Sequence, residues 1–123
     1  MNLNHITISV SDIQRSIDFY KTLGLHLLVR ADHYCRFIIP GNNATFSLHL
    51  SHDIQPGSTV IYVENEKLET VVQFLKDSGI IFEQEPKGEP WLWREAYLRD
   101  PDGHRICLYY AGESRLNPPQ AGE

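Results

Sequence analysis

Residues 19–25 read FYKTLGL and residues 74–80 read FLKDSGI, and the two stretches share a phenylalanine, a lysine and a glycine followed by an aliphatic residue. A helical pattern precedes each stretch, and a β-rich run, HITISV or TVIYV, precedes each helix. A repeat of this kind constrains the architecture before any single residue is interpreted. The chain is therefore predicted to contain two copies of one module.

The first copy has the pattern of a strand, a helix and three further strands. Residues 5–10 alternate between polar and apolar side chains, and Ser11 with Gln14 has the form of a capping box for the helix that follows. Gly24 suits the left-handed residue that ends this helix. Turn-forming residues then separate three more predicted strands, near 25–31, 34–39 and 45–50.

The second copy repeats this order. A strand at 58–63 precedes a helix from about 66 to 77, which Gly79 closes. The remaining strands are predicted near 80–84, 93–99 and 104–110. The predicted fold class is α+β, with two βαβββ modules in one chain, mixed sheets curled around a trough, and the helices on the outside.

The length of 123 residues suits one compact domain, 1–123, with its own core. Hydrophobic residues make up 41% of the chain and charged residues 22%, as in ordinary globular proteins. Within the domain we place module one at 3–50, a linker at 51–57, module two at 58–110 and a tail at 111–123.

Charge and hydropathy exclude two kinds of partner. The formal net charge is −5, and no run of Lys or Arg is long enough to follow a phosphate backbone. Nucleic acid is therefore not expected as a partner. No apolar stretch approaches the roughly 20 residues that cross a bilayer, and residues 1–20 have no signal-peptide pattern. We expect a cytoplasmic protein with no membrane partner and with Cys35 and Cys107 reduced.

The face of each strand that points away from the helices is polar and aromatic. Such a face often meets water in an antiparallel sheet, but aromatic walls with a few polar groups are also typical of a ligand pocket. A third interpretation is that Trp93 covers a subunit interface. The residues assigned to this face are His5, His49, Tyr62, Trp93, Glu95, Tyr97, Arg99, Arg105, Cys107 and Tyr109.

The doubled pattern, together with NHITISVSDIQRSIDFYKTLGL at 4–25 and DPDGHRICLYY at 100–110, resembles the vicinal oxygen chelate superfamily. That superfamily includes glyoxalase I, fosfomycin-resistance enzymes, extradiol dioxygenases and bleomycin-binding proteins. The resemblance covers about residues 3–110. It implies a small-molecule substrate, a homodimer and, in many members, a divalent metal ion held by side chains from strands one, four, five and eight.

Two of those four positions carry ordinary metal ligands. His5 matches the strand-one histidine, and His49 lies where glyoxalases of this type place a carboxylate. Ser58 stands where a histidine is usual, and Cys107 stands where the family usually has glutamate. Glu95 is the candidate for the missing carboxylate. If Cys107 were a metal ligand, its thiolate would favour zinc or copper. The alternative is that Cys107 is a small buried apolar residue with no role as a ligand.

Two hypotheses of different class follow. In the leading one, a divalent metal ion of unknown identity on His5, His49 and Glu95 or water acts as a Lewis acid in a lyase, isomerase or dioxygenase, and Glu95 or Tyr97 moves a proton. Glyoxalase-like isomerisation is disfavoured because two family ligands are lost. In the other, the protein is a metal-free module that sequesters a small molecule. In either case, the predicted substrate-binding residues are Tyr62, Trp93, Arg99, Arg105 and Tyr109.

Overall fold

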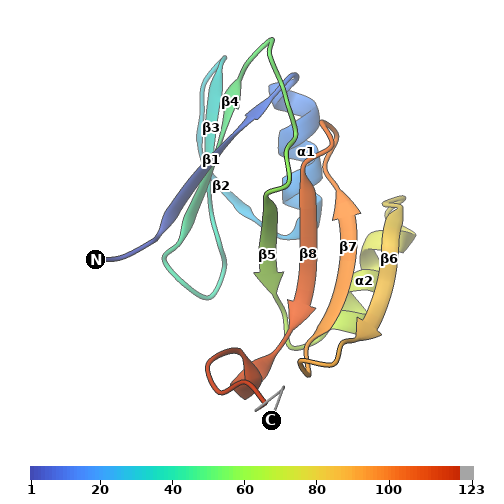
Figure 1. The fold of residues 1–123 in the computed structure, drawn as a ribbon. Coiled ribbons are helices and arrows are strands. Elements are labelled where there is room, and N and C mark those ends of the chain that lie inside the picture. Colours follow the sequence, from blue (N-terminus) through green and yellow to red (C-terminus); the bar gives the residue numbers. More distant parts are fainter. Residues whose placement is uncertain (120–123) are drawn as a thin grey trace. The chain divides into compact units, whose positions relative to one another are not determined.

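The structure, a computed structural model, describes residues 1–119 and contains the same order of elements twice (Figure 1). The prediction of two βαβββ modules is thereby confirmed. The first module consists of β1 (His5–Val10), α1 (Ile13–Leu23), β2 (His26–Arg30), β3 (Tyr34–Ile38) and β4 (Thr45–Leu50). The second consists of β5 (Val60–Glu64), α2 (Leu68–Asp77), β6 (Phe82–Gly88), β7 (Arg94–Arg99) and β8 (Arg105–Tyr110), followed by the 3₁₀ turn η1 (Gly112–Arg115).

Each module forms a mixed four-stranded sheet, as predicted. The strand orders are β1-β4-β3-β2 and β5-β8-β7-β6, with β1 parallel to β4 and β5 parallel to β8. The chain divides into two compact units, Met1–Pro56 (unit 1) and the part from Gly57 onward (unit 2), so each unit holds one complete module. Neither helix, of 11 and 10 residues, reaches the length and apolarity of a membrane span within residues 1–119.

Helix α1 begins one residue later than the capping-box pattern predicts. Its N-cap is Asp12, whose carboxylate accepts a backbone N–H of the first turn at 3.0 Å. The Gln14 side chain donates to Asp18 at 2.8 Å rather than back to the cap, so the assignment to Ser11 is corrected. The reason is that Asp is at least as good an N-cap acceptor as Ser. Gly24, at φ 112°, ends the helix in the left-handed conformation, as predicted.

The helix-facing side of each sheet is the core of its unit. In unit 1, the Tyr20 ring on α1 lies 6.1 Å from the Phe37 ring and 4.9 Å from the Phe46 ring. In unit 2, the buried side chains of α2 and of the corresponding strand register are Leu68, Val72, Leu75, Ala96, Leu98, Ile106 and Leu108. Because the helices cover these sides, the opposite faces of the sheets hold the residues left for function.

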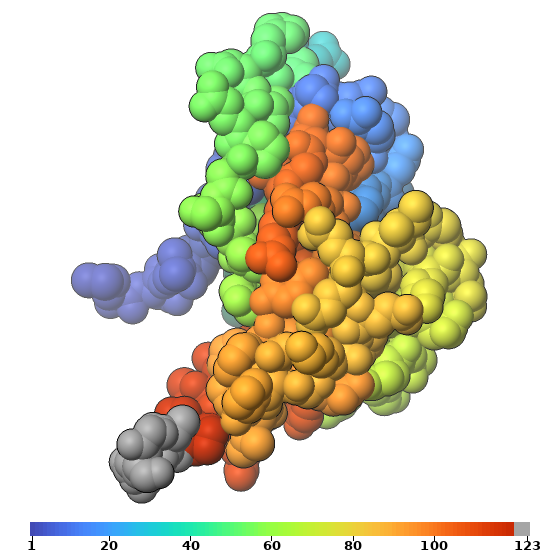
Figure 2. Space-filling model, turned by 45° about the vertical axis from the view of Figure 1, so that its right-hand side comes forward, coloured from blue at the N-terminus to red at the C-terminus, as the bar shows by residue number. Residues whose placement is uncertain are grey.

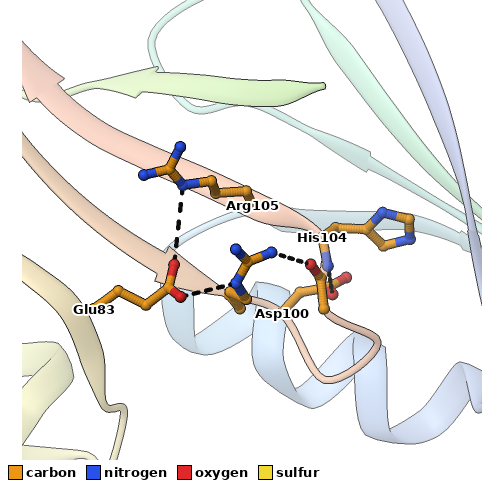
Figure 3. Close-up of polar contacts among 6 residues, drawn as sticks. Glu83, Asp100, His104 and Arg105 are labelled. Carbon is orange, nitrogen blue, oxygen red and sulfur yellow. Dashed lines mark hydrogen bonds and ion pairs between the residues drawn. The ribbon is translucent and has the colours of Figure 1, made fainter. Parts of the chain in front are cut away.

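The DPDG turn sets the register between β7 and β8. Asp100 is only 4% exposed, and its Oδ1 accepts the backbone N–H of Asp102 at 3.0 Å. It also accepts the backbone N–H of His104 at 2.8 Å (Figure 3). These bonds close the turn so that Tyr97 pairs with Cys107, as the sequence predicts. The turn therefore positions the two strands that carry most of the candidate site.

Candidate functional site

The non-helix face of the second sheet carries the candidate residues in three rows that cross β5, β8 and β7. Strand pairing sets the rows, because registered partners point to the same side of a sheet. The rows are Val60, Arg105 and Arg99; Tyr62, Cys107 and Tyr97; and Glu64, Tyr109 and Glu95. The predicted sharing of one face is thus realised in unit 2.

Three aromatic rings at one end of this face form the aromatic cluster, Tyr62, Trp93 and Tyr109. Trp93 and Tyr109 are stacked with centroids 4.8 Å apart, and Tyr62 meets them edge-on at 6.2 and 5.5 Å respectively. Tyr109 is 7% exposed, whereas Tyr62 is 47% exposed. Tyr109 is therefore the buried ring of the cluster, and Tyr62 is an exposed ring on which a flat ligand can stack.

A buried carboxylate lies beside the aromatic cluster. Glu95 is 3% exposed, and it pairs across the strands with Tyr109. Its Oε1 accepts the Tyr97 hydroxyl at 2.7 Å, and its Oε2 accepts the Trp91 indole N–H at 2.8 Å. None of the ion pairs within residues 1–119 involves Glu95. This carboxylate is held by neutral donors alone.

Burial and the Glu95 carboxylate raise the pKa values of two groups on this face, the Tyr97 hydroxyl and the Cys107 thiol. Burial, followed by the hydrogen bond to Glu95, raises the pKa of the Tyr97 hydroxyl far above its usual range. Burial also raises the pKa of the Cys107 thiol to about 11, a rise that the negative Glu95 reinforces and the hydrogen bond to Tyr97 opposes. Cys107 is therefore a neutral thiol near pH 7, with little of the thiolate that a nucleophile needs.

The two arginines predicted to bind substrate lie on this face and already have partners. Arg99 Nε donates to Glu83 Oε2 at 2.9 Å, and its Nη1 donates to the Gly103 carbonyl at 2.9 Å. Arg105 Nε lies 3.9 Å from Glu83 Oε1, an ion-pair distance longer than a hydrogen bond (Figure 3). The Arg105 guanidinium also stands over the Tyr97 ring, 4.0 Å from its centroid.

The non-helix face of the first sheet holds both candidate histidines, but the sheet keeps them apart. His5 pairs with Thr45 and His49 pairs with Ser9, so the two residues are four positions apart along parallel strands. At the usual rise this is about 13 Å. The His5 ring bonds to Thr45 Oγ1 through Nδ1 at 2.6 Å and to Thr7 Oγ1 through Nε2 at 3.2 Å.

The side chains present do not fit a mononuclear metal centre. Within residues 1–119, no group of three or more His, Cys, Asp or Glu side chains is arranged to hold a metal ion. His5 and His49 do not converge in unit 1, and both carboxylate oxygens of Glu95 already accept hydrogen bonds. A site of two imidazoles and one carboxylate needs all three at one point.

A hydrogen-bonded network that the sequence did not reveal lies on the same face of the first sheet. The Tyr34 hydroxyl accepts from Arg36 Nε and bonds to Ser47 Oγ, both at 2.8 Å. The bond with Ser47, helped by the Arg36 charge, lowers the pKa of Tyr34. The three residues share one face by strand period and register, so alternation was an available signal.

Two residues that organise the second sheet's face were also missed. Trp91 has the same parity as Glu95 but lies in the turn before β7, where strand alternation does not predict the direction of a side chain. Glu83 lies on β6, whose pairing with β7 shifts register between Phe82 and Gln84 and again between Gln84 and Lys87. Simple alternation therefore gave no reason to place Glu83 beside Arg99.

Two βαβββ modules, each with a mixed sheet covered by one helix and a functional face on the other side, define a class of small α+β proteins. The chain belongs to the Glyoxalase/Bleomycin resistance protein/Dioxygenase superfamily, whose family model matches residues 2–108. The vicinal oxygen chelate resemblance predicted from the sequence is thus confirmed.

Curated relatives and solved structures agree with this assignment. Metallothiol transferase FosB of Staphylococcus saprophyticus is 32% identical, over 88% of this chain and 76% of its own length. A trivalent organoarsenical cleaving enzyme of a Bacillus species is 24% identical, over 97% of this chain and 81% of its own. The structure of a bleomycin resistance determinant encoded on transposon Tn5 has a TM-score of 0.77 at 16% identity, covering 91% and 99% of the two chains.

Proposed function

We propose that this protein binds a small, partly aromatic molecule on the non-helix face of the second sheet and that it does so without a metal ion. The observation that carries the proposal is the aromatic cluster beside the buried Glu95–Tyr97 pair, with its packed Tyr109 and its open Tyr62. Aromatic walls with a few fixed polar groups are typical of small-molecule sites. All of these groups belong to one unit.

The polar groups of this site define what it does to a bound molecule. The Tyr97 hydroxyl keeps its proton and donates a hydrogen bond to Glu95, so the pair offers fixed acceptor oxygens at the edge of the aromatic cluster. In a sequestering protein these groups orient the ligand. In an enzyme, Glu95 would be the group that accepts a proton from a bound substrate, and Tyr97 would orient Glu95.

A metal-dependent enzyme is the second candidate. The observation that favours it is the 32% identity with a metallothiol transferase, together with His5 at the strand-one position. It is ranked second because Ser58 and Cys107 replace two family ligands and because the Cys107 thiol is buried and protonated. A cytoplasmic homodimer is proposed for either candidate, from the resemblance and the composition.

Metal content and thermal stability separate the two candidates. We expect protein purified without a histidine tag to contain substoichiometric metal, and its melting temperature to be unchanged when Mn, Fe, Ni or Zn is added. A metal ion that binds the folded state must stabilise it. One bound ion per chain, with a higher melting temperature on adding that ion, would favour the metalloenzyme.

A matched pair of variants tests the location of the site. Trp93→Ala removes one side of the stacked pair and is expected to abolish the binding of aromatic probes in calorimetry. Phe74→Ala is the control, since Phe74 is an aromatic residue of unit 2 that is 58% exposed on helix α2. Loss of binding in both variants, or in neither, would contradict the assignment of the site to this face.

A further inference from the structure

We propose that Glu95 selects ligands carrying a cationic nitrogen, an ammonium or a guanidinium, and that the Trp91 indole N–H occupies the place of that nitrogen in the free protein. The inference rests on the proposed function, because it assigns the charge of the molecule that the second sheet binds. It follows from the charges on this face, from the rings beside Glu95 and from the turn that carries Trp91.

Within residues 1–119, Glu95 is the acidic group of this face that forms no ion pair. Arg99 and Arg105 share the Glu83 carboxylate, and Arg115 pairs with Glu64 at 4.0 Å. Among the ion pairs formed within residues 1–119, none reaches Glu95. A buried carboxylate with neutral donors is poorly compensated for its lost hydration. A ligand cation would supply the missing charge.

The aromatic cluster favours a ligand of the same charge. Tyr109 pairs with Glu95 across the strands, and Trp93 precedes Glu95 by two residues, so both rings flank the carboxylate on its own side of the sheet. The π faces of tryptophan and tyrosine attract cations. The aromatic rings and the carboxylate therefore both favour a cation that carries a ring. The negative charge of Glu95 would repel an anion.

Trp91 shows where the cationic nitrogen would lie. Its indole N–H is 2.8 Å from Glu95 Oε2, the distance at which a ligand N–H would also bind. A cationic donor makes a stronger bond to a carboxylate than a neutral indole does. Replacement of the indole by an ammonium or guanidinium is therefore favourable once the ligand ring rests on the aromatic cluster.

The turn that carries Trp91 is suited to release it. The turn forms part of the molecular surface (Figure 2), and Trp91 is 45% exposed. The next residue, Leu92, has a φ of 69°, in the left-handed region that side chains other than glycine and asparagine disfavour. The indole is held to the carboxylate by one hydrogen bond. Displacing it costs that bond and leaves strands β6 and β7 intact.

Three probes with one ring system separate charge from aromatic stacking. They are tryptamine, a cation, N-acetyltryptamine, which is neutral, and indole-3-propionate, an anion, each titrated calorimetrically into the full-length protein. We expect tryptamine to bind about tenfold more tightly than N-acetyltryptamine, as a charge-assisted hydrogen bond predicts. Indole-3-propionate should bind most weakly of the three.

Variants tie this preference to Glu95 and Trp91. Glu95→Gln keeps the shape and removes the charge, so the ratio of tryptamine to N-acetyltryptamine affinity should fall to about one. Trp91→Phe keeps a ring but removes the indole N–H, so tryptamine should bind several-fold more tightly because it displaces no donor. Trp91→Phe and the wild-type ranking keep the proposal testable even if Glu95→Gln fails to fold, which circular dichroism would show.

The outcomes distinguish this inference from the proposed function. Equal affinity for tryptamine and N-acetyltryptamine would overturn the cation preference while leaving aromatic binding intact. Tightest binding of indole-3-propionate would overturn it in favour of an anion held by Arg99 and Arg105. Failure of all three probes to bind would count against the cation site and against the proposed function together.

Discussion

The non-helix faces of the two sheets belong to sheets of the same strand order but differ in chemistry. On the first sheet, His5 bonds to the hydroxyls of Thr7 and Thr45, and the histidine is exposed. On the second, Cys107 and Tyr109 are buried, and Trp93 and Tyr97 pack against them. The same strand order thus carries a largely polar face in one copy and a packed aromatic face in the other.

The repeated fold therefore does not determine the side-chain chemistry of either face. Function depends on side chains added to a shared scaffold. On the first face, polar side chains hydrogen-bond to one another: the Tyr34 hydroxyl bonds to both Arg36 and Ser47. The second face buries a carboxylate beside rings and leaves Tyr62 open.

Removal of the Tyr109 ring should give the largest loss of stability. Tyr109→Ala deletes a 7% exposed ring that contacts Trp93 and Tyr62, so we expect the free energy of unfolding to fall by about 3 kcal/mol. Tyr109→Phe, the control, keeps the ring and should cost less than about 1 kcal/mol. Urea unfolding followed by tryptophan fluorescence measures both, because Trp91 and Trp93 report on unit 2. Similar losses in the two variants would show that ring packing is not what holds this face.

High pH should weaken the second face through Cys107. Its pKa rises from an ordinary value of 9.0 to about 11 in the folded protein, so the thiol's contribution is present below pH 9 and is lost as the pH rises from 9 to 11. The loss amounts to at most about 3 kcal/mol. The measurement is the urea midpoint between pH 8 and 10, below the range in which the raised pKa of Tyr97 adds a loss of its own. Cys107→Ala should flatten this dependence, and an equally steep decline in the variant would contradict the assignment.

Much of this contrast could be predicted from the sequence, and the rest depended on long-range geometry. Strand alternation placed Trp93, Glu95 and Tyr97 on one face because side chains alternate with period two. The separation of His5 from His49 needed the register between β1 and β4, which no local pattern contains. The positions of Glu83 and Trp91 depended on register shifts in β6 and on the β6–β7 turn.

Removal of the Glu95 carboxylate should have an intermediate effect. Glu95→Ala leaves the Tyr97 hydroxyl and the Trp91 indole N–H without their acceptor, and we expect a loss of about 2 kcal/mol. Glu95→Gln keeps an acceptor and should lose less. Thermal and urea unfolding of the two variants check this order, and a more stable Glu95→Ala variant would show that the carboxylate is not stabilised by its donors.

Removal of either histidine of the first face should have the smallest effect. His5 and His49 are exposed, so His5→Ala and His49→Ala should each change the free energy of unfolding by no more than about 0.5 kcal/mol. Both variants should also bind aromatic probes as the wild type does. Calorimetric titration of tryptamine tests this, and a clear loss of affinity in either variant would assign function to the first sheet.

Mapping of tryptamine binding by NMR shows whether the second sheet's face binds the ligand without a metal ion. Backbone amide shifts would be recorded for isotope-labelled protein dialysed against EDTA. We expect titration to move the signals of Tyr62, Trp93, Glu95, Tyr97 and Tyr109, while the signals of β1 and β4 stay in place. Shifts centred on β1 and β4, or shifts that occur only after a divalent metal is restored, would contradict it.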